Sequence, residues 1–87
     1  MYWDVVEVRS TAPRELSVRF EDGLSGLLHI DLSFCTGVFD SLRNDQLVGS
    51  AQVENGVVVW PNGLDLAPDT MYREIRRSPD HRYNLFR

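Results

Sequence analysis

The sequence has no lysine, one cysteine and two histidines among its 87 residues. A lone cysteine, Cys35, excludes an internal disulfide, so a secreted scaffold held by disulfides is excluded and a reducing compartment, the cytoplasm, is expected. No His-x-His, Cys-x-x-Cys or His-Glu-x-x-His spacing is present, so the chain lacks a ligand set for zinc. We therefore expect no metal and no cofactor.

Long apolar runs and catalytic motifs are also missing. The longest apolar block, residues 57–60, has the length of a strand, whereas a membrane-spanning helix needs about 20 apolar residues. Residues 1–4 show no basic segment followed by an apolar run, so no signal peptide is expected. A Gly-x-Ser-x-Gly elbow, a P-loop and a dinucleotide fingerprint are all absent, and we predict that the protein is not an enzyme and has no catalytic residues.

Arginine is abundant instead, and it is unevenly placed. The net charge is −4, but residues 1–72 carry four arginines and eleven acidic residues, a charge of −7, whereas residues 73–87 carry a charge of +3. That basic end holds two acidic residues and five arginines, which are Arg73, Arg76, Arg77, Arg82 and Arg87. The use of arginine alone reflects either genome composition or selection for the bidentate contacts that lysine does not make.

Alternating apolar and polar residues predict strands in the first half of the chain. The apolar positions form runs separated by a break at residues 10–13 and a turn at residues 21–23: Val6, Val8, Leu16, Val18, Phe20, Leu24, Leu28, Ile30 and Leu32. A three-residue loop with a left-handed Gly23 pairs Leu16 with Leu28, whereas a two-residue loop would turn every apolar side chain to the opposite face. We therefore predict the three-residue loop.

The second half predicts one more hairpin and two helices. Asn55-Gly56 is typical of a type I′ turn, which pairs Val53 with Val58 and Ala51 with Trp60. A short helix is expected over residues 38–43, ended by Asn44-Asp45 and followed by an irregular stretch at 46–50. A second helix is expected over residues 68–77, because proline suits a first turn, with a buried stripe of Met71, Tyr72 and Ile75.

Together these elements predict an α+β fold. The prediction is a small antiparallel sheet built from hairpins, with one short helix and a C-terminal helix. A single domain is expected over residues 1–78, followed by a C-terminal tail over residues 79–87. Because the chain is short, the domain buries a small core.

A longer motif runs from Trp60 to Tyr72 and reads Trp-Pro-Asn-Gly-Leu-Asp-Leu-Ala-Pro-Asp-Thr-Met-Tyr. It resembles the closing signature of a bacterial family known as domain of unknown function 2442, W-P-N-G-x-D-[IL]-x-x-[DE]-x-L-Y. Met71 stands where that family usually has leucine. Two upstream segments, residues 20–32 and 36–42, are similar to the family's F-x-D-G hairpin and its G-x-x-F-x-x-L segment, although Leu47 stands where phenylalanine is expected.

The resemblance implies an α+β fold with an antiparallel sheet and short helices, and it implies no enzyme activity. Genes of the family often lie beside a gene for a second small protein, an arrangement similar to toxin–antitoxin pairs. Some longer relatives carry a helix-turn-helix domain after this one. Only about ten residues follow the predicted helix here, too few for such a domain, so DNA binding by that route is not expected.

Two segments are candidate sites, and each has a structural alternative. The Trp60-to-Asp65 motif fits a joint in which Trp60 enters the core and Asp65 caps the following helix, or else a recognition surface around Asn62 and Asp65. The arginine-rich end fits a solvated helix terminus, a surface for an acidic protein partner, or a contact with nucleic acid. The acidic remainder of the chain makes nucleic acid the weaker alternative.

We therefore predict a non-catalytic protein-interaction module, an antitoxin-like or accessory member of a two-gene cassette. Its partner would be a protein, encoded by the adjacent gene, and a homodimer stays open. The alternative is a nucleic-acid-associated regulator that uses the arginine-rich segment. The candidate partner-binding residues are Arg73, Arg76, Arg77, Arg82, Tyr83, Phe86, Asn62 and Asp65.

Overall fold

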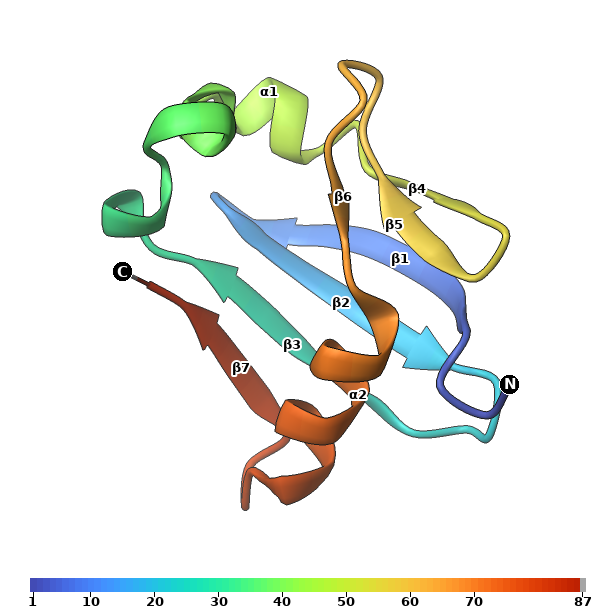
Figure 1. Ribbon diagram of the computed structural model, residues 1–87. Helices are drawn as coiled ribbons and strands as arrows, with labels where there is room; N and C mark the ends of the chain where they lie inside the picture. Colours follow the sequence, from blue (N-terminus) through green and yellow to red (C-terminus); the bar gives the residue numbers. More distant parts are fainter. Residues whose placement is uncertain (87) are drawn as a thin grey trace.

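The computed structural model describes residues 1–86 and has an α+β fold with two small sheets (Figure 1). The main sheet has the order β1-β2-β3-β7 and contains β1 (Val5–Ala12), β2 (Glu15–Phe20), β3 (Ser25–Ile30) and β7 (Arg82–Leu85). The small sheet has the order β4-β5-β6 and contains β4 (Gln52–Glu54), β5 (Val57–Val59) and β6 (Asp65–Leu66). The helices are the 3-10 segments η1 (Leu32–Phe34) and η2 (Gly37–Arg43), and α1 (Asp45–Val48) and α2 (Pro68–Arg77).

Both predicted hairpin turns are confirmed. Leu16 lies opposite Leu28, and Gly23 adopts a φ of 94°, as the three-residue loop requires. In the second hairpin Val53 lies opposite Val58, and the turn residues Asn55 and Gly56 both have positive φ, at 53° and 79°. These registers direct the apolar side chains of each hairpin to one face, because a slip of one residue would reverse every side chain.

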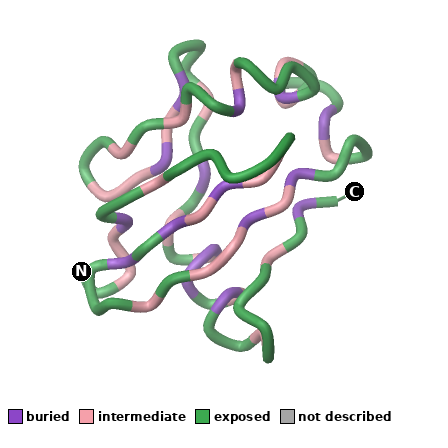
Figure 2. The backbone as a smooth tube through the Cα atoms, turned by 180° about the vertical axis from the view of Figure 1, so that it is seen from behind, coloured by how far each residue is buried: buried purple, intermediate pink, exposed green. Residues whose placement is uncertain are grey.

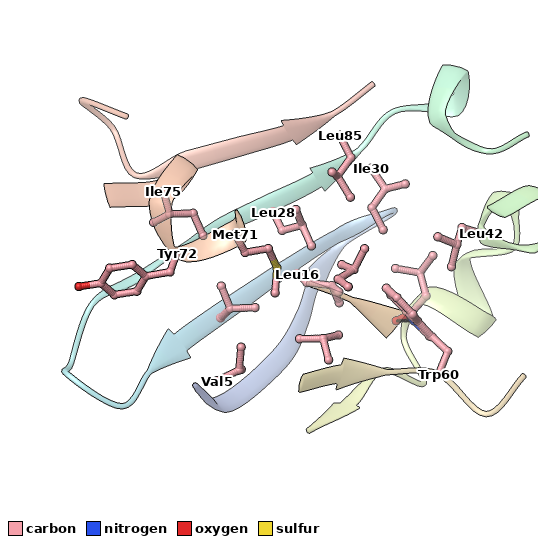
Figure 3. Close-up of a cluster of buried hydrophobic side chains, with 14 of the residues drawn as sticks. Val5, Leu16, Leu28, Ile30, Leu42, Trp60, Met71, Tyr72, Ile75 and Leu85 are labelled. Atoms are coloured by element: carbon pink, nitrogen blue, oxygen red, sulfur yellow. Dashed lines mark hydrogen bonds between the residues drawn. The ribbon is translucent and has the colours of Figure 1, made fainter. Parts of the chain in front are cut away.

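One core lies between the main sheet, the small sheet and helix α2 (Figure 3). Trp60 fills it from the end of β5, with 3% of its surface exposed, and its indole Nε1 donates to the Val48 carbonyl at 3.2 Å. Met71 and Ile75 of α2 are also buried there, as the sequence predicts. The other face of the main sheet is not covered by any helix or by the small sheet (Figure 2).

The first strand differs from the prediction in phase and in length. Val5 is buried, whereas Val6 is 44% exposed, because the pairing with β2 shifts register between Val5 and Glu7. Such a bulge inserts one unpaired residue and changes the side-chain parity on either side of it. The strand also continues to Ala12, through most of the expected break, and turns at Pro13 and Arg14, whose φ is 52°.

The middle of the chain also differs from the prediction. The expected helix at 38–43 is a 3-10 helix, and α1 spans residues 45–48, although an irregular stretch was predicted at 46–50. Asn44 does not simply end the first helix. Its Oδ1 accepts the backbone N–H of Gln46 at 2.8 Å and so caps the second. Asparagine suits both a helix end and a helix start, and the sequence alone did not separate the two roles.

The segment predicted as a C-terminal tail contains strand β7. This strand pairs in parallel with β3, with Leu28 opposite Tyr83 and Ile30 opposite Leu85, so the main sheet is not wholly antiparallel. Leu85 is buried, with 7% of its surface exposed. Residues 82–85 thus form one edge of the main sheet and belong to the folded unit.

Candidate functional site

Helix α2 presents a row of arginines on the side that faces away from the core. Its buried stripe fixes the rotation of the helix and consists of Met71, Tyr72 and Ile75. Residues three or four positions apart share a helix face, so Arg73, Arg76 and Arg77 all project outward. All three are exposed. The structure therefore brings three of the predicted site residues onto one surface.

A hollow of about 510 Å³ lies along this row of arginines. We call it the arginine groove, and it is lined by Tyr2, Trp3, Asp69, Tyr72, Arg73, Arg76 and Arg77. Tyr2 and Trp3 precede β1, so the groove joins the start of the chain to its last helix (Figure 1). Neither aromatic residue was predicted from the sequence as part of a site. The available signal was an aromatic pair that no strand pattern placed in the core.

Aromatic rings run from the core to the surface of the groove. The ring centroids of Phe20 and Tyr72 are 5.2 Å apart, those of Tyr72 and Tyr2 are 5.1 Å apart, and those of Tyr2 and Trp3 are 4.8 Å apart. All three pairs meet edge to face, the geometry that the ring quadrupoles favour. Tyr2 contacts the rings of Tyr72 and Trp3 but remains 53% exposed, so its outer face is open to solvent.

Two further contacts involve Tyr72, which lines the groove, and the residues on either side of Tyr2 and Trp3. The Tyr72 hydroxyl donates to Oδ2 of Asp22 in the β2–β3 loop. This hydrogen bond raises the pKa of Tyr72 and, together with the Leu24 N–H, lowers the pKa of the Asp22 carboxyl. The amino group of Met1 lies 3.1 Å from Oδ2 of Asp4, which keeps the segment before Tyr2 beside the first strand.

The groove carries positive charge that is only partly neutralised. Within residues 1–86, no ion pair involves Arg73 or Arg76, whereas Nε of Arg77 lies 3.6 Å from Oε2 of Glu74. Arg76 also contributes, after the hydrogen bonds, to the lowered pKa of Asp22. Arginines without carboxylate partners beside an exposed ring can bind a ligand that combines negative charge with an apolar or aromatic group.

The remaining C-terminal candidates line a second hollow of about 360 Å³. We call it the β7 hollow, and it is lined by Glu74, Arg77, Ser78, Arg82, Tyr83, Asn84 and Phe86. Nη2 of Arg82 is paired with Oε2 of Glu15 at 3.2 Å, and burial raises the pKa of the half-buried Tyr83. Arg77 borders both hollows, so they are neighbours along α2. Arg87, part of the predicted basic end, lies outside the described residues.

Asn62 and Asp65 are not brought together with the arginines. Asn62 lies in the β5–β6 turn, which is at the far end of β6 from α2 (Figure 1), and Asp65 lies in β6 itself. Asn62 has a structural role, because its amide nitrogen donates to Oγ of Ser41 at 2.9 Å and its Oδ1 accepts the Leu64 N–H at 3.3 Å. Asp65 is exposed in β6, opposite Val59.

The predicted helix cap is wrong. Asp65 pairs within the small sheet before α2 begins, and Ala67 occupies the N-cap position without a side-chain hydrogen bond. The helix still starts at Pro68, whose missing N–H needs no partner in a first turn. The predicted start of the helix at Pro68 is correct, but the residue predicted to cap it, Asp65, is not the N-cap residue.

The Cys35 thiol and the candidate metal ligands were also compared with the requirements of a reactive or metal-binding site. Cys35 is fully buried, its Sγ lies 3.6 Å from the Asp31 carbonyl, and burial raises the pKa of its thiol. A thiol of this kind is a poor nucleophile, because the thiolate is the reactive form. Across residues 1–86 there is no group of three His, Cys, Asp or Glu side chains placed to hold a metal ion. In the same range no helix has the length and apolar character needed to cross a membrane.

The family model described as a protein of unknown function, DUF2442, matches residues 5–77. The chain belongs to the DUF2442 family. No curated protein and no solved structure shows a significant match to it.

In this DUF2442 protein the signature from Trp60 to Tyr72 is explained by the fold. Trp60, Met71 and Tyr72 are buried in the core, and Gly63 takes a φ of 94° in the turn after Trp60. The arginines of α2 lie inside the matched residues 5–77, whereas Tyr2, Trp3 and strand β7 lie outside them. The arginine groove therefore combines the family domain with residues that precede it.

Proposed function

We propose that this DUF2442 protein is a non-catalytic protein-binding module, and that the arginine groove is its docking site. The observation that carries the proposal is the juxtaposition of Arg73 and Arg76, which have no ion-pair partner within residues 1–86, with the exposed ring of Tyr2. The occupant is an acidic segment of a partner protein that carries an aromatic or large apolar side chain.

The chemistry of the groove favours such a segment. Arginine and tyrosine are among the residue types enriched at the points that dominate binding energy in protein interfaces. A guanidinium group binds a carboxylate through two parallel hydrogen bonds, and the edge-to-face array of rings offers an apolar surface beside it. The charge of −7 on residues 1–72 repels a long polyanion, so it favours a short acidic peptide over nucleic acid.

A role as the antitoxin-like or accessory member of a two-protein pair inside the cell follows from this proposal. A module that binds one protein partner, without chemistry of its own, suits the neutralisation or assembly of that partner. The support is the resemblance to a family whose genes lie beside that of a second small protein, together with the arginines of the groove beside the exposed ring of Tyr2. Such a partner would be the product of the adjacent gene.

A selection from a library of random displayed peptides tests the docking site. The expected enriched peptides combine Asp or Glu with an aromatic residue or leucine. The double variant Arg73→Ala/Arg76→Ala should bind them about tenfold more weakly or worse, because two charge-assisted contacts are lost. The matched control is Arg9→Ala/Arg19→Ala, which removes two exposed arginines from the uncovered face of the main sheet and should leave binding unchanged.

Two results would overturn the proposal. One is an enriched peptide set without acidic residues, or a set that both double variants bind equally. The other is tighter binding to a DNA or RNA oligonucleotide, with an affinity that falls steeply with salt as several phosphate contacts require. That second result would favour the nucleic-acid-associated regulator.

The adjacent-gene protein can be tested by co-expression with the full chain. Co-purification with the wild type and with Arg9→Ala/Arg19→Ala, but not with Arg73→Ala/Arg76→Ala, is the expected outcome. If the adjacent-gene protein does not co-purify with the wild type, the hypothesis of a two-protein pair is wrong. The proposal that the groove binds an acidic peptide is then still decided by the peptide selection.

A further inference from the structure

Strand β7 leaves one edge of the main sheet open. Within residues 1–86 its one strand partner is β3, whereas β1 at the opposite edge has the small sheet beside it, where the Val5 N–H donates to the Gly56 carbonyl at 2.9 Å. In Figure 1 and in Figure 2, no element lies beyond β7. An unpaired strand edge is a template for pairing with another chain.

The direction of the backbone groups of β7 can be read from its bonds to β3. The Leu27 N–H donates to the His81 carbonyl at 2.9 Å, and the Asp31 N–H donates to the Leu85 carbonyl at 2.8 Å. Odd-numbered residues therefore point their backbone groups towards β3. Even-numbered residues, Arg82 and Asn84, point theirs outward, as does Phe86 directly after the strand.

We infer that a second copy of this chain pairs with the open edge of β7, antiparallel and about a two-fold axis at Asn84. In that register the two Asn84 residues exchange backbone hydrogen bonds, and each Phe86 N–H reaches the Arg82 carbonyl of the other copy. The Arg82 N–H already has a partner in its own chain, Oγ of Ser78 at 3.2 Å.

Of the registers centred on Arg82, Asn84 or Phe86, whose backbone groups point outward, the one at Asn84 makes the side chains of β7 self-complementary. Centring on Asn84 places Arg82 opposite Phe86 of the other copy and Tyr83 opposite Leu85, so each cross-strand pair joins a cation to a ring or a ring to an aliphatic group. Centring on Arg82 would place arginine opposite arginine, which is destabilising. Centring on Phe86 would leave Arg82 and Tyr83 without opposite residues.

Exposure at the edge supports the same arrangement. Phe86 is 67% exposed, on the outer side of the sheet that it shares with Arg82. The β7 hollow borders the same residues, Arg82, Asn84 and Phe86, on the side of the strand away from β3 and towards the end of α2. Pairing covers Phe86 with the guanidinium of Arg82, which can keep its contact with Glu15. Arg82, Tyr83 and Phe86 are thereby assigned to self-association, whereas Arg73 and Arg76 remain with the arginine groove.

Sedimentation equilibrium of the full chain tests the inference with two substitutions at one exposed position. A strand pair this short buries less than the roughly 1,200 Å² of a stable complex, so we expect a dimer that forms between about micromolar and millimolar concentrations. Phe86→Arg places arginine opposite Arg82 twice and should weaken the dimer about tenfold or more, whereas Phe86→Glu should retain it. The net charge of −4 alone predicts the reverse order, because Phe86→Arg reduces self-repulsion.

A cysteine cross-link tests the register independently. In the pair centred on Asn84 the two Cα atoms lie about 5.5 Å apart, within the range of a disulfide. Asn84→Cys should therefore form a covalent dimer under mild oxidation, whereas Ser25→Cys, exposed at the start of β3, should not. Cys35 is fully buried and does not interfere. A monomer throughout the concentration range, equal weakening by both Phe86 variants, or equal cross-linking by Ser25→Cys would overturn the inference.

Discussion

At the scale of single residues, Trp60 joins the two sheets. It directly follows β5, contacts the core shared with the main sheet, and binds the backbone of α1 through its indole nitrogen. A large ring with 3% of its surface exposed combines apolar burial with a satisfied polar group. Its position explains why the motif that begins with it is a joint between strand, turn and helix.

Replacing Trp60 should have a large effect on stability. Trp60→Ala should lower the free energy of unfolding by about 3–5 kcal/mol, the usual cost of emptying the site of a large buried ring. Trp60→Phe keeps most of the apolar volume but removes one of the two hydrogen bonds to the Val48 carbonyl, which still accepts the Ala51 N–H at 3.2 Å, and should cost less, about 1–3 kcal/mol. Denaturant unfolding of the wild type and of both variants measures the free energies of unfolding. A decrease of only a few tenths of a kcal/mol for Trp60→Ala would contradict the burial of the ring.

The contact between Tyr72 and Asp22 predicts a pH effect. Because the pKa of Asp22 is lowered in the fold, chiefly by the Tyr72 hydroxyl, its contribution to stability is complete above the ordinary value of about 3.9. That contribution is lost as the pH falls through the lowered pKa of the folded state. Tyr72→Phe should raise the pKa of Asp22 towards its ordinary value. The pKa should not reach that value, because the Leu24 N–H still donates to the Asp22 carboxyl.

An NMR titration of the Asp22 side-chain carboxyl measures this shift. The pKa of Asp80, which the Ser78 hydroxyl lowers at the other end of α2, should stay unchanged and serves as an internal control. An equal change at both carboxyls would indicate a general effect of the substitution on the fold rather than the loss of one hydrogen bond.

At the scale of elements, Gly26 allows β3 to lie against both α2 and the turn that leads into β7. A Cβ atom at this position would sit 2.5 Å from the His81 carbonyl oxygen and 2.5 Å from Cγ2 of Ile75. A side chain larger than hydrogen therefore forces backbone to move. This close approach is what brings the C-terminal segment to the sheet edge.

Gly26→Ala should therefore destabilise the domain strongly, by more than the roughly 1 kcal/mol typical of a substitution. Gly49→Ala is the matched control, since its Cβ would meet the Asp45 carbonyl at 3.4 Å and its backbone is already helical. Thermal melts followed by circular dichroism compare the two. Similar melting temperatures for both variants would mean that β3 and the His81 turn are not in close contact.

Strand β7 is a further element whose role can be measured. A chain that ends at Ser78 loses the pairing with β3 and the burial of Leu85, a loss of about 2–5 kcal/mol. In a domain of this size the melting temperature should fall by roughly 10 °C or more. A chain that ends at Leu85 removes the exposed Phe86 but keeps the strand, and should melt near the wild type. An unchanged melting temperature for the shorter chain would show that β7 adds nothing to the fold.

At the scale of the whole molecule, the two sheets share a single core. Buried residues from both sheets and from α2 form one cluster, and neither sheet has a separate core of its own (Figure 3). In a domain of 87 residues this arrangement favours a single cooperative transition. The open edge at β7 and the arginine groove both lie on the outside of this unit, away from the buried cluster.

Cooperativity predicts that two optical signals change together. Tryptophan fluorescence, which reports Trp60 between the sheets, and far-ultraviolet circular dichroism, which reports the backbone, should give the same midpoint in urea. The variant Trp3→Phe isolates the signal of Trp60, because these are the two tryptophans of the chain. Separate midpoints would mean that the small sheet unfolds independently of the main sheet.

The sequence by itself determined the parts that depend on neighbouring residues. The registers at Gly23 and at Asn55-Gly56 follow from which turn aligns the apolar positions, and helix α2 starts at Pro68 and buries the predicted stripe. The three arginines of the groove were also predictable, because helical spacing places Arg73, Arg76 and Arg77 on one side.

Only the tertiary structure decided which distant segments meet. Alternation indicates which face of a strand is buried but not which strand lies beside it, so the parallel pairing of β7 with β3 could not be derived from local pattern. The same limit applies to Tyr2 and Trp3, which reach α2 because their rings pack along the path from Phe20. Contacts between residues that are far apart in the sequence depend on how the elements pack around the core. Local propensity does not predict that packing.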